Sequence, residues 1–116
     1  MAYEKGEVKN IMKSENAVVI SIFKLKKEVN IVDFMIASDK LNDDYLSKQK
    51  GYISRQLLSN GDIWTDIMTY DTIEDIQKVI EIAYAGNAPA FTEYVAYLDE
   101  AAEGTCDYTL SVKKVY

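Results

Sequence analysis

The sequence contains no histidine, one cysteine, one proline and five glycines among its 116 residues. Without histidine, the chain lacks both the side chain that titrates nearest neutral pH and the commonest metal ligand. This excludes Ser-His-Asp and Cys-His catalysis, and it excludes an ordinary zinc site built within one chain. The scattered glycines match neither GxGxxG nor GxxxxGK[ST], the two common phosphate-binding patterns. We therefore expect a protein that uses no metal and no cofactor.

Three further absences narrow the setting in which the protein works. A single cysteine, Cys106, cannot form an internal disulfide and is typical of a reducing compartment, so we expect a cytoplasmic protein. No run approaches the ~18 apolar residues of a membrane span, and the charged start MAYEKGEVKN has no apolar leader segment. The net charge of −6 disfavours nucleic acid and anionic membranes as partners, because both attract basic surfaces.

The length and the apolar content predict one folded domain. A chain of 116 residues with 48% apolar residues can bury a core of its own. Residues 1–16 are charged and weakly periodic, and we expect them to form an N-terminal tail. The domain should then extend over residues 17–116.

The most informative stretch is Gly51–Asp71, in which two apolar-rich runs flank Asn60-Gly61. Asn-Gly between such runs predicts a β-hairpin with a type I′ turn, because both central residues of that turn need positive φ. The two strands should cover residues 52–58 and 63–70. With a two-residue turn at Asn60-Gly61, three pairs of residues should lie directly opposite each other: Arg55–Asp66, Leu57–Trp64 and Ile53–Met68.

The remaining elements follow from periodicity and from capping signals. A β-branched, nearly continuous apolar run predicts a strand over residues 17–26, and alternation predicts another over residues 107–116. Helical spacing predicts a helix over residues 30–47, which Asn30 or Asp33 can cap. A second helix should start from a capping box at Asp71–Glu74, break at Gly86–Pro89 and resume over residues 90–100.

This order of elements predicts a ferredoxin-like βαββαβ fold, which is a four-stranded antiparallel sheet with both helices on one face. The helix-facing side of the hairpin should carry Arg55, Trp64 and Asp66. The opposite side should carry a mixture of polar and apolar residues: Tyr52, Ser54, Gln56, Leu58, Ile63, Thr65, Ile67 and Thr69. This face is too apolar to stay in water, so we expect a homodimer in which two sheets face each other.

Three segments resemble the dimeric α+β barrel superfamily, which includes the antibiotic-biosynthesis-monooxygenase-like domains. The segments are Gly51–Arg55, Asp62–Ile67 and Tyr70–Asp75. These families often start the second strand with Gly-aromatic-x-x-Arg, and their third strand often ends in Trp-Glu-Ser, where this chain has Tyr-Asp-Thr. The resemblance implies a dimeric α+β barrel with a small-molecule cavity between the sheet and the helices.

The resemblance transfers unevenly to individual residues. Cofactor-independent monooxygenases of this group use an Asn on the third strand and a Trp four residues later, and Asp66 and Tyr70 occupy those positions here. Ile76 replaces a further aromatic residue, and the histidine that haem-degrading relatives need is missing. We therefore expect a small-molecule-binding protein. The alternative is a cofactor-independent monooxygenase-like enzyme acting on an aromatic or polyketide-like substrate.

Six residues are candidates for a ligand site, of which Arg55, Asp66 and Tyr70 are also the catalytic candidates: Arg55, Trp64, Asp66, Tyr70, Phe91 and Tyr94. Arg55 and Asp66 could form a structural ion pair, or they could serve as an anchor for an anionic or enolate oxygen and as a general base. A carboxylate held beside an arginine is a weak base at neutral pH, which counts against proton abstraction. Tyr70 should lie at the cavity mouth, whereas Trp64, Phe91 and Tyr94 could be core residues or cavity walls.

Overall fold

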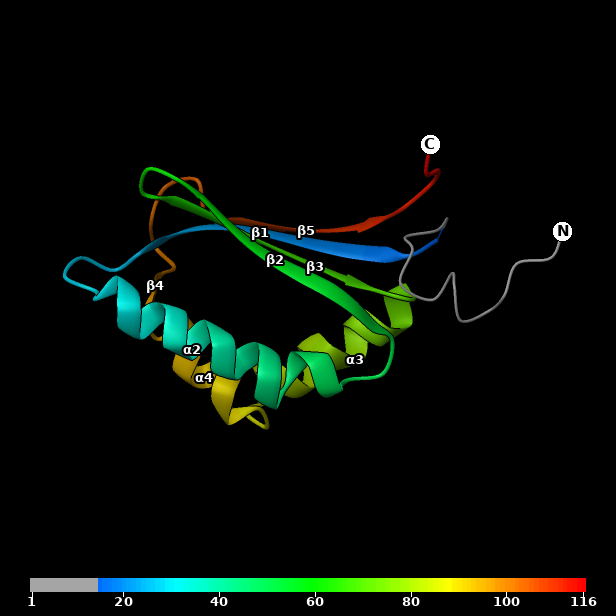
Figure 1. The fold of residues 1–116 in the computed structure, drawn as a ribbon, viewed down its shortest axis with the longest axis horizontal. Helices are drawn as coiled ribbons and strands as arrows, with labels where there is room; N and C mark the ends of the chain where they lie inside the picture. The colour runs from blue at the N-terminus through cyan, green and yellow to red at the C-terminus, as the bar shows by residue number, and fades with distance from the viewer. Residues whose placement is uncertain (1–14) are drawn as a thin grey trace, which may run out of the picture.

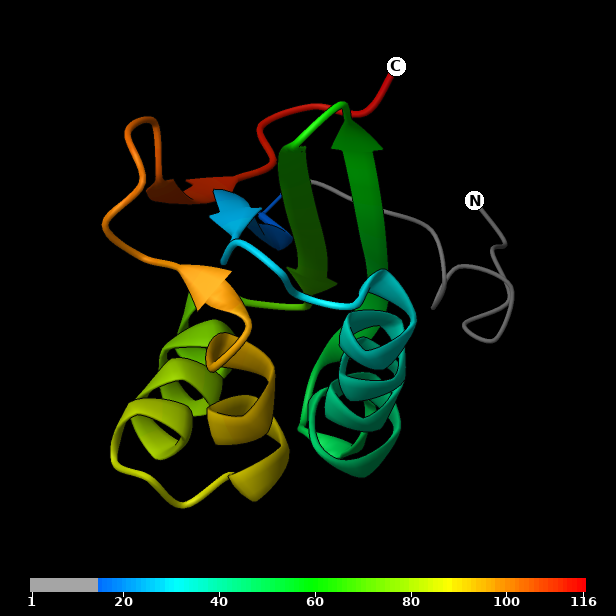
Figure 2. The same cartoon turned by 90° about the vertical axis from the view of Figure 1, so that its left-hand side faces the viewer.

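Helices cover only one face of an antiparallel sheet in the computed structural model, which describes residues 15–116 (Figures 1 and 2). The strands are β1 (Ala17–Leu25), β2 (Tyr52–Asn60), β3 (Ile63–Tyr70), β4 (Leu98–Asp99) and β5 (Cys106–Ser111). The helices are α2 (Ile31–Asp44), the short 3-10 helix η1 (Leu46–Lys48), α3 (Ile73–Tyr84) and α4 (Pro89–Val95). Strand β1 lies inside the sheet, with β3 on one side and both β5 and β4 on the other, while β2 forms the far edge beside β3.

The predicted ferredoxin-like α+β architecture is confirmed, with one added strand. In the part of the chain that the structure describes, the sheet has five strands rather than four, because β4 pairs with Lys24 and Leu25 at the end of β1. The helix expected over residues 90–100 ends at Val95, where the chain turns into β4. Residues 1–14 of the predicted tail lie outside the described residues. Asn16 is buried, and its side chain donates a hydrogen bond to the carbonyl of Asp71.

The helix starts are held by side-chain caps. The Asn30 side chain accepts hydrogen bonds from the backbone N–H groups of Val32 and Asp33 at 2.8 and 3.2 Å, which settles the choice between the two predicted caps. Helix α3 begins one residue later than the predicted capping box, because the hydroxyl of Thr72 accepts from the N–H of Asp75 at 3.1 Å. These caps fix the chain direction as each helix leaves the sheet.

The β2–β3 hairpin has a different turn from the one expected. Asn60 and Ile63 close the ladder, so the two turn residues are Gly61 and Asp62. Gly61 has a φ of 63° and Asp62 is not among the residues with positive φ, which fits a type II′ turn rather than type I′. The predicted direct pairs are therefore wrong, and the observed pairs are Arg55–Met68, Leu57–Asp66 and Ser59–Trp64. The error is a shift of two positions, and such a shift leaves every side chain on its expected face.

An irregularity near the start of β2 reverses one face assignment. The ladder is interrupted between Tyr52 and Ser54, so Tyr52 turns towards the helices instead of the open face. Its hydroxyl donates to the Asn42 side chain on α2 at 3.4 Å, and its ring packs edge-on against Tyr70 at 5.7 Å. The expected position of Tyr52 on the open face is therefore wrong.

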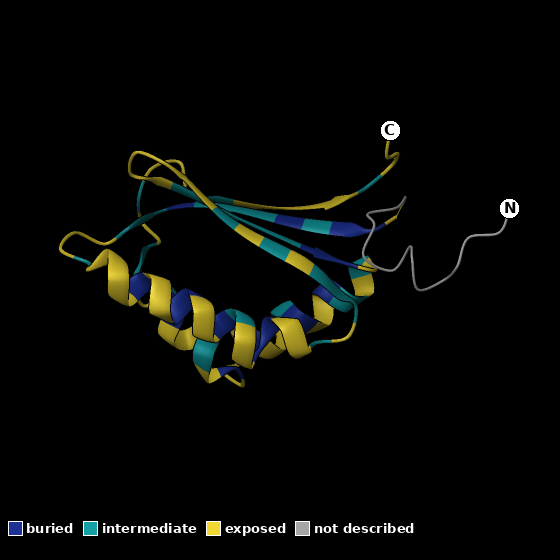
Figure 3. Ribbon diagram, in the orientation of Figure 1, coloured by how far each residue is buried: buried dark blue, intermediate teal, exposed yellow. Residues whose placement is uncertain are grey.

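The core lies between the sheet and the helices, and the opposite sheet face carries no helix (Figure 3). Inward-pointing residues such as Val19 and Phe23 of β1 are buried against α2, α3 and α4. The open face exposes large apolar side chains from three strands: Leu58, Ile63, Tyr108 and Leu110. Within residues 15–116, no helix is long and apolar enough to cross a membrane.

Candidate functional site

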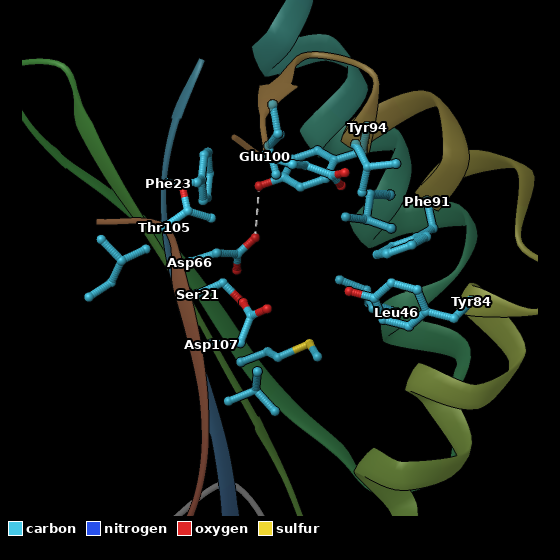
Figure 4. A pocket seen from close by; sticks show the side chains of 16 residues that line it. Ser21, Phe23, Leu46, Asp66, Tyr84, Phe91, Tyr94, Glu100, Thr105 and Asp107 are labelled. Atoms are coloured by element: carbon cyan, nitrogen blue, oxygen red, sulfur yellow. Dashed lines mark hydrogen bonds between the residues drawn. The ribbon is translucent and has the colours of Figure 1, made fainter. Parts of the chain in front are cut away.

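A cavity of about 400 Å³ lies between the inner face of the sheet and the helices (Figure 4). Its floor comes from β1, β3 and β5, and its opposite wall comes mainly from the end of α3 and from α4. A second hollow of about 230 Å³ shares Ser21, Met68, Tyr84 and Phe91 with it and extends it along α3. Most of the lining is aromatic or aliphatic, as in typical sites for small organic ligands.

Three polar side chains form a row across the floor of this cavity. Ser21 of β1 pairs with Asp66 of β3 on one side and with Asp107 of β5 on the other. Directly paired residues on neighbouring antiparallel strands point to the same face of the sheet, so all three side chains face the cavity. Their row offers carboxylate and hydroxyl oxygens in an otherwise apolar surface, and it would orient a ligand that donates hydrogen bonds.

Asp66 is held by a buried network of hydrogen bonds. The Nε atom of Arg55 donates to Oδ1 of Asp66 at 3.0 Å, and Nη2 donates to Oδ2 at 2.8 Å. The hydroxyl of Tyr94 donates to the same Oδ2 atom at 2.9 Å. On the other side of the guanidinium, the carbonyl and the hydroxyl of Ser38 each accept from Arg55 at 3.0 Å. The network therefore ties β2 and β3 to α2 and α4.

Burial and charge fix the protonation states in this network. Burial lowers the pKa of Arg55, but the hydrogen bond and the charge of Asp66 outweigh this effect, and the net pKa lies above its ordinary value. Burial raises the pKa of Tyr94, and the negative charge of Asp66 raises it further. Tyr94 is thus a neutral hydroxyl donor, and the Asp66 side chain faces the cavity with both oxygens already bonded to Arg55.

The mouth of the cavity is aromatic and acidic. Tyr84 packs edge-on against Phe91 with their ring centres 5.3 Å apart. Tyr84, Glu100 and Asp107 line the same cavity and are all exposed. Partial burial raises the pKa of the Tyr84 hydroxyl, and the charges of Asp107 and Glu100 raise it further. Across the described chain, no lysine or arginine lines the cavity.

The six predicted residues divide into two groups. Asp66, Phe91 and Tyr94 line the cavity, whereas Arg55, Trp64 and Tyr70 do not. Arg55 lies behind Asp66 and donates to Asp66 and to Ser38, as in a structural ion pair, which was the first of its two predicted roles. Trp64 packs edge-on against Phe34 at 5.2 Å as a core residue.

The expectation that Tyr70 lies at the cavity mouth is wrong. Its side chain is fully buried, and its hydroxyl donates to the carbonyl of Leu46 at 2.8 Å. Burial raises its pKa, and the neighbouring Tyr45 and Tyr52 raise it further. Helix η1 covers the end of β3 and closes it to ligand, so Tyr70 fastens that helix to the sheet.

Of the sixteen lining residues, thirteen were not predicted, and the polar ones among them include Ser21, Tyr84, Glu100 and Asp107. The sequence did contain a signal for Ser21. It is the only polar residue in the apolar run 17–23, and a serine that points inward marks a gap in a packed sheet face. Asp107 becomes part of the row only through the β1–β5 register, which no local pattern encodes. Tyr84 and Glu100 flank α4 and meet only when the broken helix folds back.

No family model matches the chain, and neither does any curated protein. Solved structures do resemble it. SnoaB, a cofactor-independent oxygenase from Streptomyces nogalater, aligns with a TM-score of 0.67 at 11% identity over 88% of this chain and 97% of that chain. A candidate antibiotic biosynthesis monooxygenase from Nitrosomonas europaea aligns with a TM-score of 0.63 at 15% identity, over 90% and 95% of the two chains.

A dimeric protein of unknown function from Bacteroides fragilis, with a ferredoxin-like fold, aligns with a TM-score of 0.55 at 11% identity over 86% of this chain and 99% of that chain. These similarities establish the fold. The chain has the ferredoxin-like α+β fold of the antibiotic-biosynthesis-monooxygenase-like proteins, as the segments quoted from its sequence predicted.

Proposed function

We propose that the protein binds a small, largely apolar molecule in the cavity between the sheet and the helices. The observation that carries this proposal is the cavity of about 400 Å³, whose lining is mostly apolar and carries a few polar groups, three of them in a row across the floor. Ligand sites are usually concave, apolar and about 300–1,000 Å³ in volume, with a few polar groups that fix the orientation of the ligand. An aromatic body would pack against Phe23, Phe91 and Tyr94, while its donor groups reach Ser21 and Asp66.

The Arg55 network gives this floor the rigidity that recognition needs. A carboxylate held by two guanidinium donors and one hydroxyl cannot change rotamer freely, so its remaining lone pairs keep a fixed direction. Little side-chain entropy is then lost when a ligand binds. This arrangement also argues for positioning rather than proton abstraction by Asp66, because its charge is already stabilised.

The test is to fill the cavity from its floor. Ser21→Leu adds an apolar side chain at the centre of the polar row, and Ser47→Leu makes the same change on the exposed surface of η1. Aromatic compounds that raise the melting temperature of the native protein should bind Ser21→Leu at least roughly ten-fold more weakly by calorimetry, because small-to-large changes leave little room in a packed site. The Ser47→Leu protein should bind them as the native protein does. Unchanged binding to Ser21→Leu, or no stabilising compound at all, would contradict the proposal.

We also propose that the open sheet face forms a homodimer. Leu58, Ile63, Tyr108 and Leu110 are exposed there, and paired positions such as Ile20 and Ile67 lie between them. The dimeric Bacteroides fragilis protein with the same kind of fold supports this proposal. A stable interface buries about 800 Å² on each partner, an area that one face of a sheet can supply.

Charged substitutions on this face test the dimer. Lysine in place of Ile63 and Leu110 should convert the dimer into a monomer in sedimentation experiments at micromolar concentration, because it buries unpaired charge in the interface. Val32→Lys, on the exposed surface of α2, provides a matched control that should leave the mass unchanged. A native protein that sediments as a monomer would refute the proposal directly.

A second candidate function is oxygenation of the bound ligand without a cofactor. The similarity to SnoaB, which is a cofactor-independent oxygenase, favours it. In such a reaction the substrate itself would reduce oxygen, and Asp66, with Arg55 behind it, would orient the reacting ring. Oxygen consumption with each tightly bound compound, and its loss in Asp66→Asn, tests this function. If the native protein binds a compound tightly without consuming oxygen, oxygenation is contradicted and ligand binding remains as the proposed function.

A further inference from the structure

All the charged side chains that line the cavity are acidic. They are Asp66 and Asp107 in the row across the floor, and Glu100 after β4; Asp107 and Glu100 are exposed, so these two lie where the cavity opens to solvent. Asp66 is paired with Arg55, so the negative charge of its carboxylate is largely offset and adds little to the electrostatic potential in the cavity. Glu100 and Asp107 form no ion pair with any residue between 15 and 116, because the salt bridges there join other side chains: Lys24–Asp62, Lys40–Glu93 and Arg55–Asp66. Within residues 15–116, the cavity therefore presents negative charge that no ion pair compensates.

This charge pattern argues against an anionic or enolate oxygen as the ligand group, which was one of the two sequence-based interpretations of the Arg55–Asp66 pair. An anionic or enolate oxygen needs a nearby cation, but the guanidinium of Arg55 does not line the cavity, and four of its five N–H donors are directed at Asp66 and Ser38. An anionic group at the mouth would also meet Glu100 and Asp107, and no basic residue among residues 15–116 lines the cavity to offset them. A cationic group would be attracted by both carboxylates, and the aromatic rings of Tyr84 and Phe91 line the same cavity.

We propose that the ligand is an aromatic compound that carries a cationic nitrogen. This inference rests on the proposed function and names the ligand class for the same cavity. The aromatic body lies between Phe23 and Phe91, where most of the lining is apolar. The nitrogen lies at the mouth, between the carboxylates of Glu100 and Asp107.

Three probes with the same body and different charge test the inference: 2-naphthylmethylamine, which is protonated at neutral pH, 2-naphthylmethanol, which is neutral, and 2-naphthoate, which is anionic. Calorimetry at low ionic strength should rank the amine first and the carboxylate last. Because each mouth carboxylate is partly in water, each should contribute roughly a five-fold gain in amine affinity. The preference for the amine should shrink as salt is added, since exposed charges are screened over about 10 Å at 0.1 M.

Charge-removing variants assign the preference to the mouth. Glu100→Gln and Asp107→Asn should each weaken amine binding about five-fold and leave binding of the alcohol unchanged. Glu81→Gln, on the exposed side of α3, removes the same charge away from the cavity and should alter neither.

Each outcome of this experiment supports or overturns one of the two proposals. If the alcohol or the carboxylate binds as tightly as the amine, the ligand class is wrong and the cavity proposal stands. If the amine preference survives in the Glu100→Gln, Asp107→Asn double variant, the assignment to the mouth carboxylates is wrong. If none of the three probes binds, the cavity proposal itself is contradicted, and the ligand class falls with it.

Discussion

Replacing Arg55 by methionine is the most direct test of what holds the cavity floor in place. Methionine keeps an unbranched apolar stem of similar reach but removes every hydrogen bond to Asp66 and Ser38. The side chains of Arg55 and Asp66 are 6% and 12% exposed, so the pair is a buried one. Removing one partner of a buried pair leaves the other charge uncompensated and costs about 3–5 kcal/mol. That is a large part of the roughly 5–15 kcal/mol that stabilises a typical domain.

The double variant separates the cost of an orphaned charge from the value of the pair. Asp66→Leu alone leaves the buried guanidinium unpaired and should cost about as much as Arg55→Met, roughly 3–5 kcal/mol. With both changes, no charge remains. The main loss is then the unpaired hydroxyls of Tyr94 and Ser38, at about 1–3 kcal/mol. The double variant should therefore be more stable than either single variant, with a coupling energy of at least about 2 kcal/mol.

Urea unfolding followed by the fluorescence of Trp64, the only tryptophan, measures all of these variants. Arg55→Lys should fall between the native protein and Arg55→Met, because one ammonium cannot serve two carboxylate oxygens and Ser38 together. Lys40→Met breaks an ion pair whose side chains are 52% and 50% exposed, and it should cost less than about 1 kcal/mol. If Arg55→Met and Asp66→Leu each lower the free energy of unfolding as little as Lys40→Met does, or if their effects add strictly in the double variant, the Arg55–Asp66 pair does not support the fold.

Two further predictions concern a glycine and the buried tyrosines. Gly51→Ala should destabilise the protein by more than the ~1–3 kcal/mol of backbone strain alone, because Gly51 has a φ of 85° and its Cβ would lie 2.2 Å from Oδ2 of Asp75. Gly86→Ala, at a φ of 82° with no atom within 4 Å, measures the strain alone, and equal losses in urea unfolding would contradict the steric argument. Burial raises the pKa of Tyr45, Tyr70 and Tyr94 above the ordinary 10.0, so these tyrosines ionise first in the unfolded chain, and the stability present below pH 10 should fall as the pH rises above it. In Tyr94→Phe, the free energy of unfolding should fall less steeply above pH 10. An unchanged slope of stability against pH in that variant would refute the assignment of this loss to Tyr94.

Local patterns predicted the elements apart from β4 and η1, and, apart from Tyr52, the side of the sheet on which the hairpin residues lie. The strand period of two places Arg55, Trp64 and Asp66 on the helix side whatever the turn, provided that the register moves by an even number. The Asn30 cap was predictable for a similar reason, because a side-chain acceptor next to a helix start acts over three residues. The turn itself was not. Asn60-Gly61 and Gly61-Asp62 both offer a glycine at positive φ, and Asn60 is exposed, so no packing difference chooses between them.

The set of residues that line the cavity depends on contacts between segments that are distant in the sequence. Ser21 and Asp107 meet only through the β1–β5 ladder, and Tyr84 approaches Phe91 only because the chain breaks at Gly86 and returns as α4. Tyr70 was misplaced for a related reason. The end of a strand is often a cavity mouth, but here η1 packs over it and accepts the hydrogen bond of the tyrosine hydroxyl. Composition and spacing do not encode which loop covers which strand end.

The contacts of Arg55 also determine how much uncompensated negative charge the cavity carries. Directly opposite Met68, Arg55 reaches Asp66 diagonally and still reaches Ser38 on α2, so sheet and helix together take up its donors. Removing this arginine should therefore do more than destabilise the fold, because it adds the uncompensated charge of Asp66 to those of Glu100 and Asp107. In Arg55→Met, measured at a temperature where the variant is folded, the ratio of 2-naphthylmethylamine affinity to 2-naphthylmethanol affinity should rise above the native ratio. An unchanged ratio in the folded variant would mean that Asp66 does not act on the bound ligand through its charge.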